Sequence, residues 1–461
     1  MELNIHSMIS MRKKRIMIYD TICAIATPFG TGGISVIRVT GADAIAKVNS
    51  IFSGADLTKQ ESHTIIYGFV LDKNKKNLDE VLISIMKAPK TFTTEDVVEI
   101  STHGGVLITK KVLERVLSTG IRLAERGEFT QRAFLNGRID LIQAEAINDL
   151  IHAKNDSAIL IANQGVGRET SKLIMSLRDM VLELVTKIEV NIDYPEYEDE
   201  VVMTKEIIIP KVKDILREME IVLKNSLKTK MIKEGIKTAI IGKPNVGKSS
   251  LLNALLEEER AIVTDYAGTT RDTIEAQINL GDITLNLVDT AGIRETKDEI
   301  EKMGISRSVR TIEEAELVLL VMDQSTSLDK EDKKLLELTK NKKRIIILNK
   351  SDLPSITKID NASIISVKNK KGIKELENRI ISELSLSEIE MNNYNYLSNS
   401  RQIGKLEEAK NVLENVLSNE MPVDILSIDI TKAFRLLSEI LGDEYQETLI
   451  NELFARFCLG K

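Results

Sequence analysis

Gly242-Lys-Pro-Asn-Val-Gly-Lys-Ser249 is a glycine-bracketed stretch that directly follows the apolar run Lys237-Thr-Ala-Ile-Ile241. It leads into Ser250-Leu-Leu-Asn-Ala-Leu-Leu256, which we expect to continue as a helix. A strand, such a loop and a helix in succession point backbone N–H groups and a helix N-terminus at one spot, where phosphate is stabilised. The stretch therefore predicts a P-loop, in which Lys248 pairs with β- and γ-phosphate oxygens and Ser249 holds Mg²⁺.

Three further motifs, each after an apolar run, indicate which nucleotide this P-loop binds. Asp289-Thr-Ala-Gly292 supplies an Asp for Mg²⁺ and a glycine amide near the γ-phosphate. In Asn349-Lys-Ser-Asp352, the two oxygens of Asp352 can accept both N–H donors of the guanine N1 and N2 edge, a pair that adenine lacks. Ser366-Val-Lys368 suits a further loop that covers guanine, so we predict GTP. The expected nucleotide contacts are Asn245, Val246, Gly247, Lys248, Ser249, Ser250, Asp289, Thr290, Ala291, Gly292, Asn349, Lys350, Asp352 and Ser366.

The stretch Thr264-Asp-Tyr-Ala-Gly-Thr-Thr270 lies where GTPases have a segment ordered by Mg²⁺ and the γ-phosphate. Its expected contacts are Thr264, Asp265, Tyr266, Ala267, Gly268, Thr269 and Thr270, with Thr270 as the second hydroxyl on Mg²⁺. Ile293 stands where Ras-like GTPases have a water-orienting Gln, so hydrolysis must draw polar groups from elsewhere. The acidic stretch Glu295-Thr-Lys-Asp-Glu-Ile-Glu301 is the nearest source, and its alternative interpretation is a solvated helix start.

Composition limits the remaining possibilities. With 461 residues and 43% hydrophobic content, the chain can bury more than one core. The lack of an 18-residue apolar run argues against a membrane span, and a net charge of −7 gives no global attraction to nucleic acid. Cys23 and Cys458 are far apart, which suits a reducing cytoplasm, and no metal-ligand spacing is present beyond Mg²⁺ with the nucleotide.

The patterning of the chain indicates a multidomain α+β and α/β protein. Short β-branched runs alternate with Gly and Pro turns from Asp20 to about Asn136, which is typical of an α+β domain. Helical spacing of apolar residues runs from about Ile139 to Lys233 and resumes at Ser400. We therefore expect a Ras-like P-loop GTPase domain inserted into one helical domain. The expected boundaries are 18–137 for the N-terminal domain, 138–233 and 389–461 for the two helical parts, and 234–388 for the GTPase domain.

Segments outside the GTPase block carry a resemblance to a known family over almost the whole chain. The segments that carry it are Asp20-Thr-Ile-Cys-Ala-Ile-Ala-Thr-Pro-Phe-Gly30 with Gly32-Gly33, Ser35-Val-Ile-Arg38, Phe92-Thr-Thr-Glu-Asp-Val-Val-Glu99, His103-Gly-Gly105, Arg126-Gly-Glu-Phe-Thr130, Ala133-Phe-Leu-Asn-Gly-Arg-Ile-Asp-Leu141, Gln143-Ala-Glu-Ala146, Ile192-Asp-Tyr-Pro-Glu196 and the terminal Phe457-Cys-Leu-Gly-Lys461. On these segments the chain resembles the MnmE (TrmE) family of tRNA-modification GTPases, whose N-terminal domain is similar to the folate-binding domains of one-carbon enzymes.

The resemblance implies partners and a reaction. It implies a homodimer built on the N-terminal domain, and an FAD-dependent partner, MnmG (GidA), in a heterotetramer or larger complex. Such proteins together modify C5 of the wobble uridine of certain tRNAs to aminomethyl or carboxymethylaminomethyl derivatives. The one-carbon unit comes from 5,10-methylene-tetrahydrofolate and the nitrogen from glycine or ammonium; 5-formyl-tetrahydrofolate is the related ligand expected to bind.

The resemblance also implies a folate site. Arg38, Glu99 and Arg138 match the folate contacts of the family, and Lys461 matches a basic residue that reaches the same ligand. Glu99 can accept from pterin N–H groups, and the cations can meet carboxylates or polar ring edges. Without the resemblance, each would be interpreted as a surface charge or a local salt bridge.

Further roles are implied for hydrolysis and for the C-terminal cysteine. In the family a K⁺ ion at the phosphates stands where an arginine finger would, with ligands expected at Asn245, Thr264, Tyr266 and Thr269. Glu301 matches a carboxylate that orients the attacking water through a bridge. Cys458 matches a cysteine suspected of a role in the modification chemistry, and its alternative is a small buried hydrophobe near Phe454 and Phe457.

Two other classes of function stay open at this point. A ribosome-assembly or translation-associated GTPase would share the P-loop and the Ile after Asp-Thr-Ala-Gly, but would lack the folate-like domain and the Cys-Leu-Gly-Lys tail. A non-catalytic scaffold would use GTP only to set its conformation, whereas Ser249, Thr270 and Asp289 favour turnover.

Overall fold

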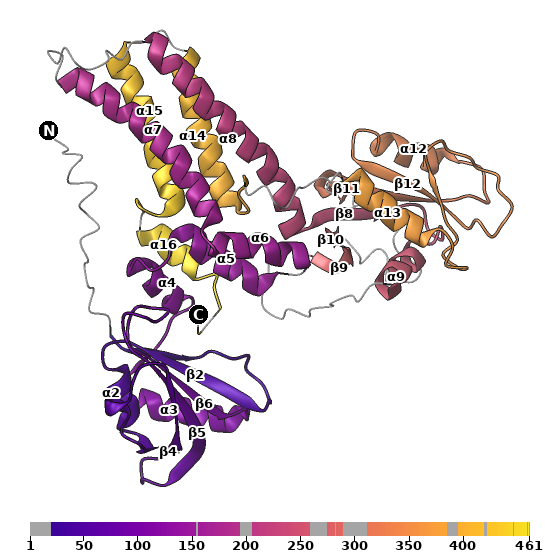
Figure 1. Cartoon of the computed structure of the whole chain (residues 1–461). Coiled ribbons are helices and arrows are strands. Elements are labelled where there is room, and N and C mark those ends of the chain that lie inside the picture. The colour runs from indigo at the N-terminus through magenta and orange to yellow at the C-terminus, as the bar shows by residue number, and fades with distance from the viewer. Residues whose placement is uncertain are drawn as a thin grey trace. The chain divides into compact units, whose positions relative to one another are not determined.

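The structure, a computed structural model, describes residues 20–153, 155–193, 205–258, 274–281, 283–288, 311–384, 395–418, 422–445, 447–458 and 460. These residues form two compact units. One unit comprises the described residues up to Asn148 together with those from Ser438 onward, and the other comprises Asp149–Leu437. Figure 1 labels their helices and strands along the chain.

The first unit contains a seven-stranded sheet in the order β3-β4-β5-β6-β2-β1-β7. Its strands are β1 (Ile22–Ile25), β2 (Ile34–Thr40), β3 (Phe52–Gly54), β4 (Thr64–Leu71), β5 (Asn77–Met86), β6 (Val97–His103) and β7 (Arg122–Leu123). Helices α2 (Ala44–Asn49) and α3 (Val106–Leu117) contact the inner strands, and a short 3₁₀ helix spans Leu57–Lys59. The sequence predicted this α+β domain, and its presence is confirmed.

The two faces of this sheet differ because strand side chains alternate. On β2, Ile37 and Val39 are fully buried in the core, whereas Arg38 lies on the opposite face, where the register pairs it with Glu99 of β6. Cys23 of β1 also belongs to this core, and burial raises the pKa of its thiol to about 12. The face that carries Arg38 is the outer face of the sheet.

Large apolar side chains are exposed on the same outer face. Tyr67 of β4 pairs with Leu82 of β5 in the register, and their exposed fractions are 58% and 47%. Ile65 of β4 and Ile34 of β2 are each 66% exposed. Contiguous exposed apolar side chains of this kind are typical of interaction surfaces.

The first unit is completed by α4 (Glu128–Leu135), α16 (Glu447–Phe454) and parts of α5 (Leu141–His152) and α15 (Val423–Leu441). Phe134, Leu141, Ile450 and Phe454 pack in one apolar cluster, which fixes the C-terminal residues in this unit. The fully buried Arg132 of α4 pairs with Asp20, Glu95 and Glu128. A buried arginine needs several such partners, because an unpaired buried charge is costly.

The helices of the second unit are α6 (Asp156–Val166), α7 (Glu169–Asp193), α8 (Lys205–Glu234), α14 (Ser400–Ser418) and the first part of α15. In Figure 1, α8 runs alongside α7 and α14, as the residue contacts confirm. Val212, Met219 and Val222 of α8 are buried, with the seven- and three-residue spacings of one helix face. The helical patterning predicted on both sides of the GTPase block is confirmed.

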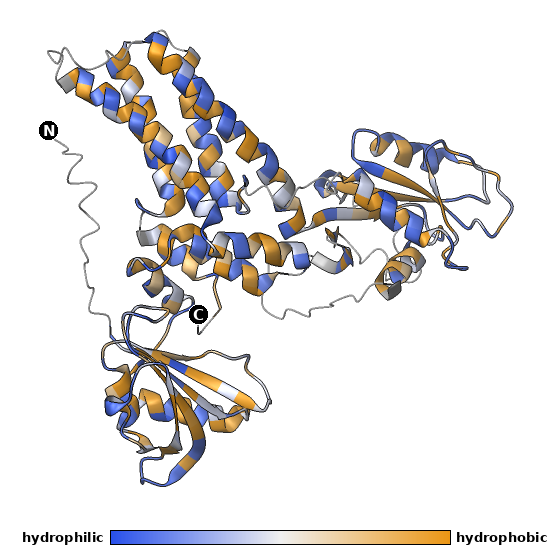
Figure 2. Cartoon of the chain, viewed as in Figure 1, coloured by the Kyte–Doolittle hydropathy of each residue, from blue (hydrophilic) through white to orange (hydrophobic). Residues whose placement is uncertain are grey.

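The same unit contains a six-stranded sheet in the order β13-β12-β11-β8-β10-β9. Its strands are β8 (Ile236–Ile241), β9 (Ile274–Leu280), β10 (Ile283–Val288), β11 (Leu317–Asp323), β12 (Arg344–Asn349) and β13 (Ser363–Ile364), and its helices are α9 (Lys248–Glu258), α12 (Lys330–Leu338) and α13 (Ile373–Glu383). All pairings are parallel except that of β9 with β10. The inner strands β8 and β11 are almost entirely buried, and β11 is apolar up to its last residue, in line with the orange strands of this sheet in Figure 2; such runs are usual in a parallel sheet.

A single residue joins the long helix α8 to the central strand β8. Gly235 has φ of 76°, and a Cβ there would lie 2.7 Å from the carbonyl oxygen of Thr284. Asn286 of β10 donates through Nδ2 to the carbonyl oxygen of Glu234 at 2.7 Å. Ile232, in the last turn of α8, is buried in the core of the sheet. The helix and the sheet are therefore packed together at this joint.

The four domain ranges expected from the sequence stay predictions. The compact units follow another division, in which the residues from Ser438 onward belong with the N-terminal part of the chain. Among the described helices, none combines the length and the apolar character that are needed to cross a bilayer.

Candidate functional site

The carboxyl ends of the parallel strands of the second unit meet at one edge of the sheet. Gly242 follows β8, Asp323 ends β11, and Asn349 ends β12. In open α/β sheets, ligands bind at this edge, where neighbouring loops diverge. The P-loop and the motif Asn349-Lys-Ser-Asp352 therefore converge there.

Two glycines permit the tight path of the P-loop. At Gly247 φ is 100°, and a Cβ would lie 2.2 Å from Nδ2 of Asn349. At Gly242 a Cβ would lie 2.2 Å from the carbonyl oxygen of Val321. Since no side chain fits at either point, the loop can curl closely over the strand ends and lead into α9 at Lys248. This is a cradle of the shape that a phosphate chain requires.

Lys248 lies inside the curl of this loop. Its Nζ donates to the carbonyl oxygens of Gly242 and Lys243, each at 2.7 Å. Burial lowers the pKa of the Lys248 ammonium, because its charged form is poorly solvated there. The negative charge of a bound phosphate would favour the charged form of Lys248, so Lys248 fits its predicted role of pairing with phosphate oxygens. Ser249 and Ser250 follow in the exposed first turn of α9.

The guanine motif is built around a buried asparagine. Asn349 is 4% exposed, and its Nδ2 donates to the carbonyl oxygen of Val246 in the P-loop at 2.9 Å. Its Oδ1 accepts from the backbone N–H of Val367 at 3.2 Å. Asn349 therefore ties the P-loop to the loop that contains Ser366.

Asp352 is exposed and oriented by a neighbour. The hydroxyl of Ser366 donates to Oδ1 of Asp352 at 2.6 Å, and this hydrogen bond holds the pKa of the carboxyl below its usual value. The carboxylate is thus ionised at neutral pH, with acceptor capacity left for the two N–H groups of guanine.

The first unit brings two of the predicted folate residues, Arg38 and Glu99, together with Gly460 of the C-terminal tail. Arg38 donates through Nε to Glu99 Oε1 at 2.8 Å and through Nη1 to the carbonyl oxygen of Gly460 at 3.3 Å. At Gly460 φ is 87°, and a Cβ would lie 2.3 Å from the carbonyl oxygen of Ile25. The C-terminal tail therefore lies against the sheet beside the pair of Arg38 and Glu99.

Two arginines stack on neighbouring aromatic rings. The guanidinium of Arg38 lies 5.8 Å from the ring centre of Phe129, and that of Arg138 lies 5.1 Å from the ring centre of Phe92. Phe92 and Phe129 belong to one small apolar cluster. Both arginines are thus held on the same part of the unit by cation–π contacts.

Two family models match most of the chain. The family model described as GTP-binding protein TrmE N-terminus matches residues 21–138, and the model described as MnmE helical domain matches residues 141–458. The tRNA modification GTPase MnmE of Acholeplasma laidlawii is 58% identical over 448 residues, which cover 96% of this chain and 100% of that protein.

The chain belongs to the MnmE family of tRNA modification GTPases. A further MnmE, from Lactococcus lactis subsp. lactis, is 48% identical over 96% of this chain and 99% of its own length. Among solved structures, a crystal structure of Era with MgGDPNP and 16S ribosomal RNA nucleotides is 28% identical, with a TM-score of 0.26, over 32% of this chain and 56% of that one. Full-length membership of the MnmE family confirms the predicted family and GTPase, and it removes the ribosome-assembly alternative.

Several residues assigned by the GTPase motifs or by the MnmE resemblance lie outside the described part of the chain. They are Thr264, Asp265, Tyr266, Ala267, Gly268, Thr269, Thr270, Asp289, Thr290, Ala291, Gly292, Glu301 and Lys461. Their roles stay predictions.

Cys458, the MnmE tail cysteine, is exposed, and its carbonyl oxygen accepts from the N–H of Gly127 at 3.3 Å. The alternative interpretation, a small buried hydrophobe, is therefore wrong, although the neighbouring Phe454 and Phe457 are buried. The backbone of the residue is held in place while its side chain is accessible.

Sequence reasoning missed the ion pairs that support the nucleotide loops in this MnmE protein. Lys350 pairs with Asp323 at 2.6 Å, and Lys243 pairs with Asp329 and Asp332, each at 2.7 Å. One signal was available for Asp323, because an acidic residue that ends an apolar parallel strand must lie at the ligand edge of the sheet.

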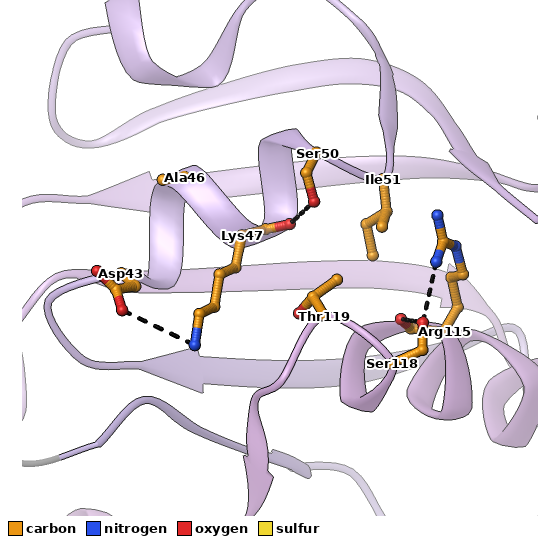
Figure 3. Close-up of a pocket in the computed structure, with 8 residues that line it drawn as sticks. All are labelled: Asp43, Ala46, Lys47, Ser50, Ile51, Arg115, Ser118 and Thr119. Atoms are coloured by element: carbon orange, nitrogen blue, oxygen red, sulfur yellow. Dashed lines mark hydrogen bonds and ion pairs between the residues drawn. The ribbon is translucent and has the colours of Figure 1, made fainter. Parts of the chain in front are cut away.

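A shallow pocket of about 440 Å³ lies beside α2 and the C-terminal end of α3. Figure 3 shows that its polar side chains pair among themselves, Lys47 with Asp43 and Arg115 with Ser118. None of the residues assigned to GTP or folate lines it. We therefore assign it no role in the MnmE reaction.

Proposed function

We propose that this GTPase acts in the cytoplasm as a homodimer, together with an FAD-dependent MnmG partner, on C5 of the wobble uridine of certain tRNAs. The product would be an aminomethyl or carboxymethylaminomethyl uridine, with the added carbon drawn from a tetrahydrofolate. The observation that carries the proposal is the full-length likeness to proteins named tRNA modification GTPase MnmE. The GTP-binding cradle and the cluster at Arg38 support it from two separate parts of the chain.

For GTP hydrolysis we propose two ions. Ser249 and Thr270 would hold Mg²⁺, together with Asp289 near the γ-phosphate. Asn245, with Thr264, Tyr266 and Thr269, would hold K⁺, which supplies positive charge beside the phosphates. The position of Asn245 supports this, since it is exposed in the P-loop with φ of 65°. Glu301 would orient the attacking water.

The purified protein should hydrolyse GTP at least about tenfold faster in K⁺ than in Na⁺ at equal ionic strength, because a lost transition-state charge costs an order of magnitude or more. Phosphate release at saturating GTP measures this, and Asn245→Ala should remove the difference between the two salts. Equal rates in K⁺ and Na⁺ would contradict the potassium role. Tight GTP binding without turnover in either salt would indicate the scaffold alternative.

We propose that the outer face of the N-terminal sheet forms the homodimer contact. The exposed Ile65, Tyr67 and Leu82 lie side by side on β4 and β5, as the register requires. Interfaces of permanent dimers are enriched in such aromatic and aliphatic side chains.

For tetrahydrofolate we propose Arg38, Glu99, Arg138 and Lys461 as contacts. Support comes from the placement of Arg38 and Glu99, whose side chains are each 27% exposed and therefore remain accessible. A carboxylate held by an arginine can accept pterin N–H groups, and the second arginine at Phe92 adds positive charge for the glutamate tail. The exposed thiol of Cys458 lies on the same tail as Gly460 and is our candidate for a role in the modification chemistry.

Glu99→Gln should weaken binding of 5-formyl-tetrahydrofolate at least about tenfold, because a charge-assisted acceptor is replaced by a neutral amide that also presents a donor. Isothermal titration of the full-length protein measures the affinity. Glu61→Gln, at an exposed position before β4, is the matched control and should leave it unchanged.

GTP hydrolysis in K⁺ should be the same for both variants, since neither change touches the nucleotide loops. If Glu99→Gln bound the folate as well as the unaltered protein does, the proposed contact would be wrong.

A further inference from the structure

The segment between β11 and α12, Asp323–Asp332, supplies none of the residues that the sequence motifs assign to GTP. It nevertheless contacts both nucleotide loops through ion pairs. One pair lies at the start of the segment, and two that share Lys243 lie at its end.

At the start of the segment, Asp323 holds the guanine motif. Its Oδ2 accepts from Nζ of Lys350 at 2.6 Å, and its Oδ1 accepts from the backbone N–H and the hydroxyl of Ser325 at 2.8 and 2.6 Å. The Asp323 side chain is only 11% exposed. Lys350 has φ of 67°, a conformation that a residue with a side chain rarely adopts, so its backbone needs support from its surroundings.

At the end of the segment, two aspartates hold the P-loop. Nζ of Lys243 lies 2.7 Å from Oδ2 of Asp332 and 2.7 Å from Oδ2 of Asp329. The Asp332 side chain is 6% exposed. Asp329 and Asp332 also form the capping box of α12, so the helix start fixes both carboxylates.

The middle of the segment is anchored to the guanine loop. The backbone N–H of Gln324 donates to the carbonyl oxygen of Asn349 at 3.0 Å, and its Nε2 donates to the hydroxyl of Ser355 at 2.7 Å. Its carbonyl oxygen accepts from the N–H groups of Ile356 and Thr357. The segment is thus a fixed support.

We propose that residues 323–332 form a brace that sets the P-loop and the guanine motif at the spacing a guanine nucleotide requires, with Asp323 and Asp332 as positioning residues. The proposal deepens the GTP-binding function of the chain. Each carboxylate acts through one lysine, Asp323 through Lys350 and Asp332 through Lys243. Because the Asp323 and Asp332 side chains are only 11% and 6% exposed, each carboxylate would be poorly solvated without its lysine, which favours keeping each pair and its loop in place.

Asp323→Asn keeps the shape of the side chain and removes its charge. It should raise the dissociation constant of GDP and the KM for GTP about tenfold, while kcat at saturating GTP stays within about twofold. Asp332→Asn should act in the same direction with a smaller effect, because Asp329 still pairs with Lys243. Glu337→Gln on α12, which removes an exposed ion pair with Lys340, is the matched control and should change neither constant.

A double-mutant cycle on the GDP affinity separates positioning from a general loss of stability. If Asp323 acts through Lys350, adding Asp323→Asn to Lys350→Met should raise the dissociation constant of GDP by less than about twofold more. The same is expected when Asp332→Asn is added to Lys243→Met. Additive losses, or a lower melting temperature with an unchanged GDP affinity, would overturn the proposal. GDP binding by the unaltered protein, measured in the same assay, tests whether the chain binds a guanine nucleotide at all, independently of the brace.

Discussion

Asp352→Asn should lower the affinity for GTP at least about a hundredfold and make xanthosine triphosphate the better substrate, because a site built for specific donors rejects the wrong pattern strongly. In the predicted site the carboxylate of Asp352 would accept both N–H groups of guanine. An asparagine keeps one acceptor and turns an N–H₂ group towards the amino group of guanine. Xanthine has a carbonyl there, which accepts that donor. Ser366 still has an oxygen at position 352 to bond, so the loop should keep its shape.

Competition of unlabelled nucleotides against a fluorescent GDP analogue measures this exchange of specificity. Asp360→Asn, at an exposed position in the same stretch between β12 and β13, is the control and should leave the preference for guanine intact. Weak binding of both nucleotides would show a damaged loop, and unchanged GTP binding would show that Asp352 does not contact the base.

Gly247→Ala should reduce nucleotide affinity by roughly two orders of magnitude, since the new methyl group collides with a buried, fixed side chain. Its Cβ would lie 2.2 Å from Nδ2 of Asn349, and φ of 100° is unfavourable for alanine. Asn349 must then give up its bond to Val246 or push the P-loop away from the guanine motif. Either movement spoils the spacing between phosphate and base sites.

Gly404→Ala is the matched control, because it adds the same methyl group at a glycine outside the nucleotide site. A Cβ at Gly404, inside α14, meets nothing within 4 Å, so Gly404→Ala should stabilise the protein by about 0.5–1 kcal/mol and leave GDP affinity unchanged. Equilibrium titration with GDP and thermal unfolding of both variants provide the test. Normal GDP affinity in Gly247→Ala would mean that the loop relaxes without cost.

The nucleotide site was predictable because its signals are local. A buried parallel strand ends, and the next few residues carry the chemistry, as at Gly242 after β8 and Asn349 after β12. Parallel pairing then brings those ends to one edge without any knowledge of distant contacts. For the same reason the strands could be assigned from apolar runs alone.

The supporting contacts were not predictable, because they join residues that are distant along the chain. Lys350 and Asp323 are 27 residues apart, Lys243 and Asp329 are 86, and Arg38 and Gly460 are 422. A lone lysine or aspartate has no pattern that names its partner, and most such charges are solvated. The family resemblance supplied Arg38, Glu99 and the tail, whereas residue patterns supplied none of them.

The joint between α8 and β8 determines where the GTPase part of this chain begins as a cooperative folding unit. The residue pattern changes from helical to strand-like at Gly235. Ile232 of the last turn of α8 is nevertheless buried in the core of the sheet, and the carbonyl oxygen of Glu234 accepts a hydrogen bond from β10. Burial of one isoleucine is worth about 1.5–3 kcal/mol, a large share of the stability of a small domain. The folded GTPase part therefore begins within α8, one turn before Gly235, where the sequence pattern changes. Because α8 ends inside the core of the sheet, a rotation or tilt of α8 would be transmitted directly to β8, the strand that leads into the P-loop.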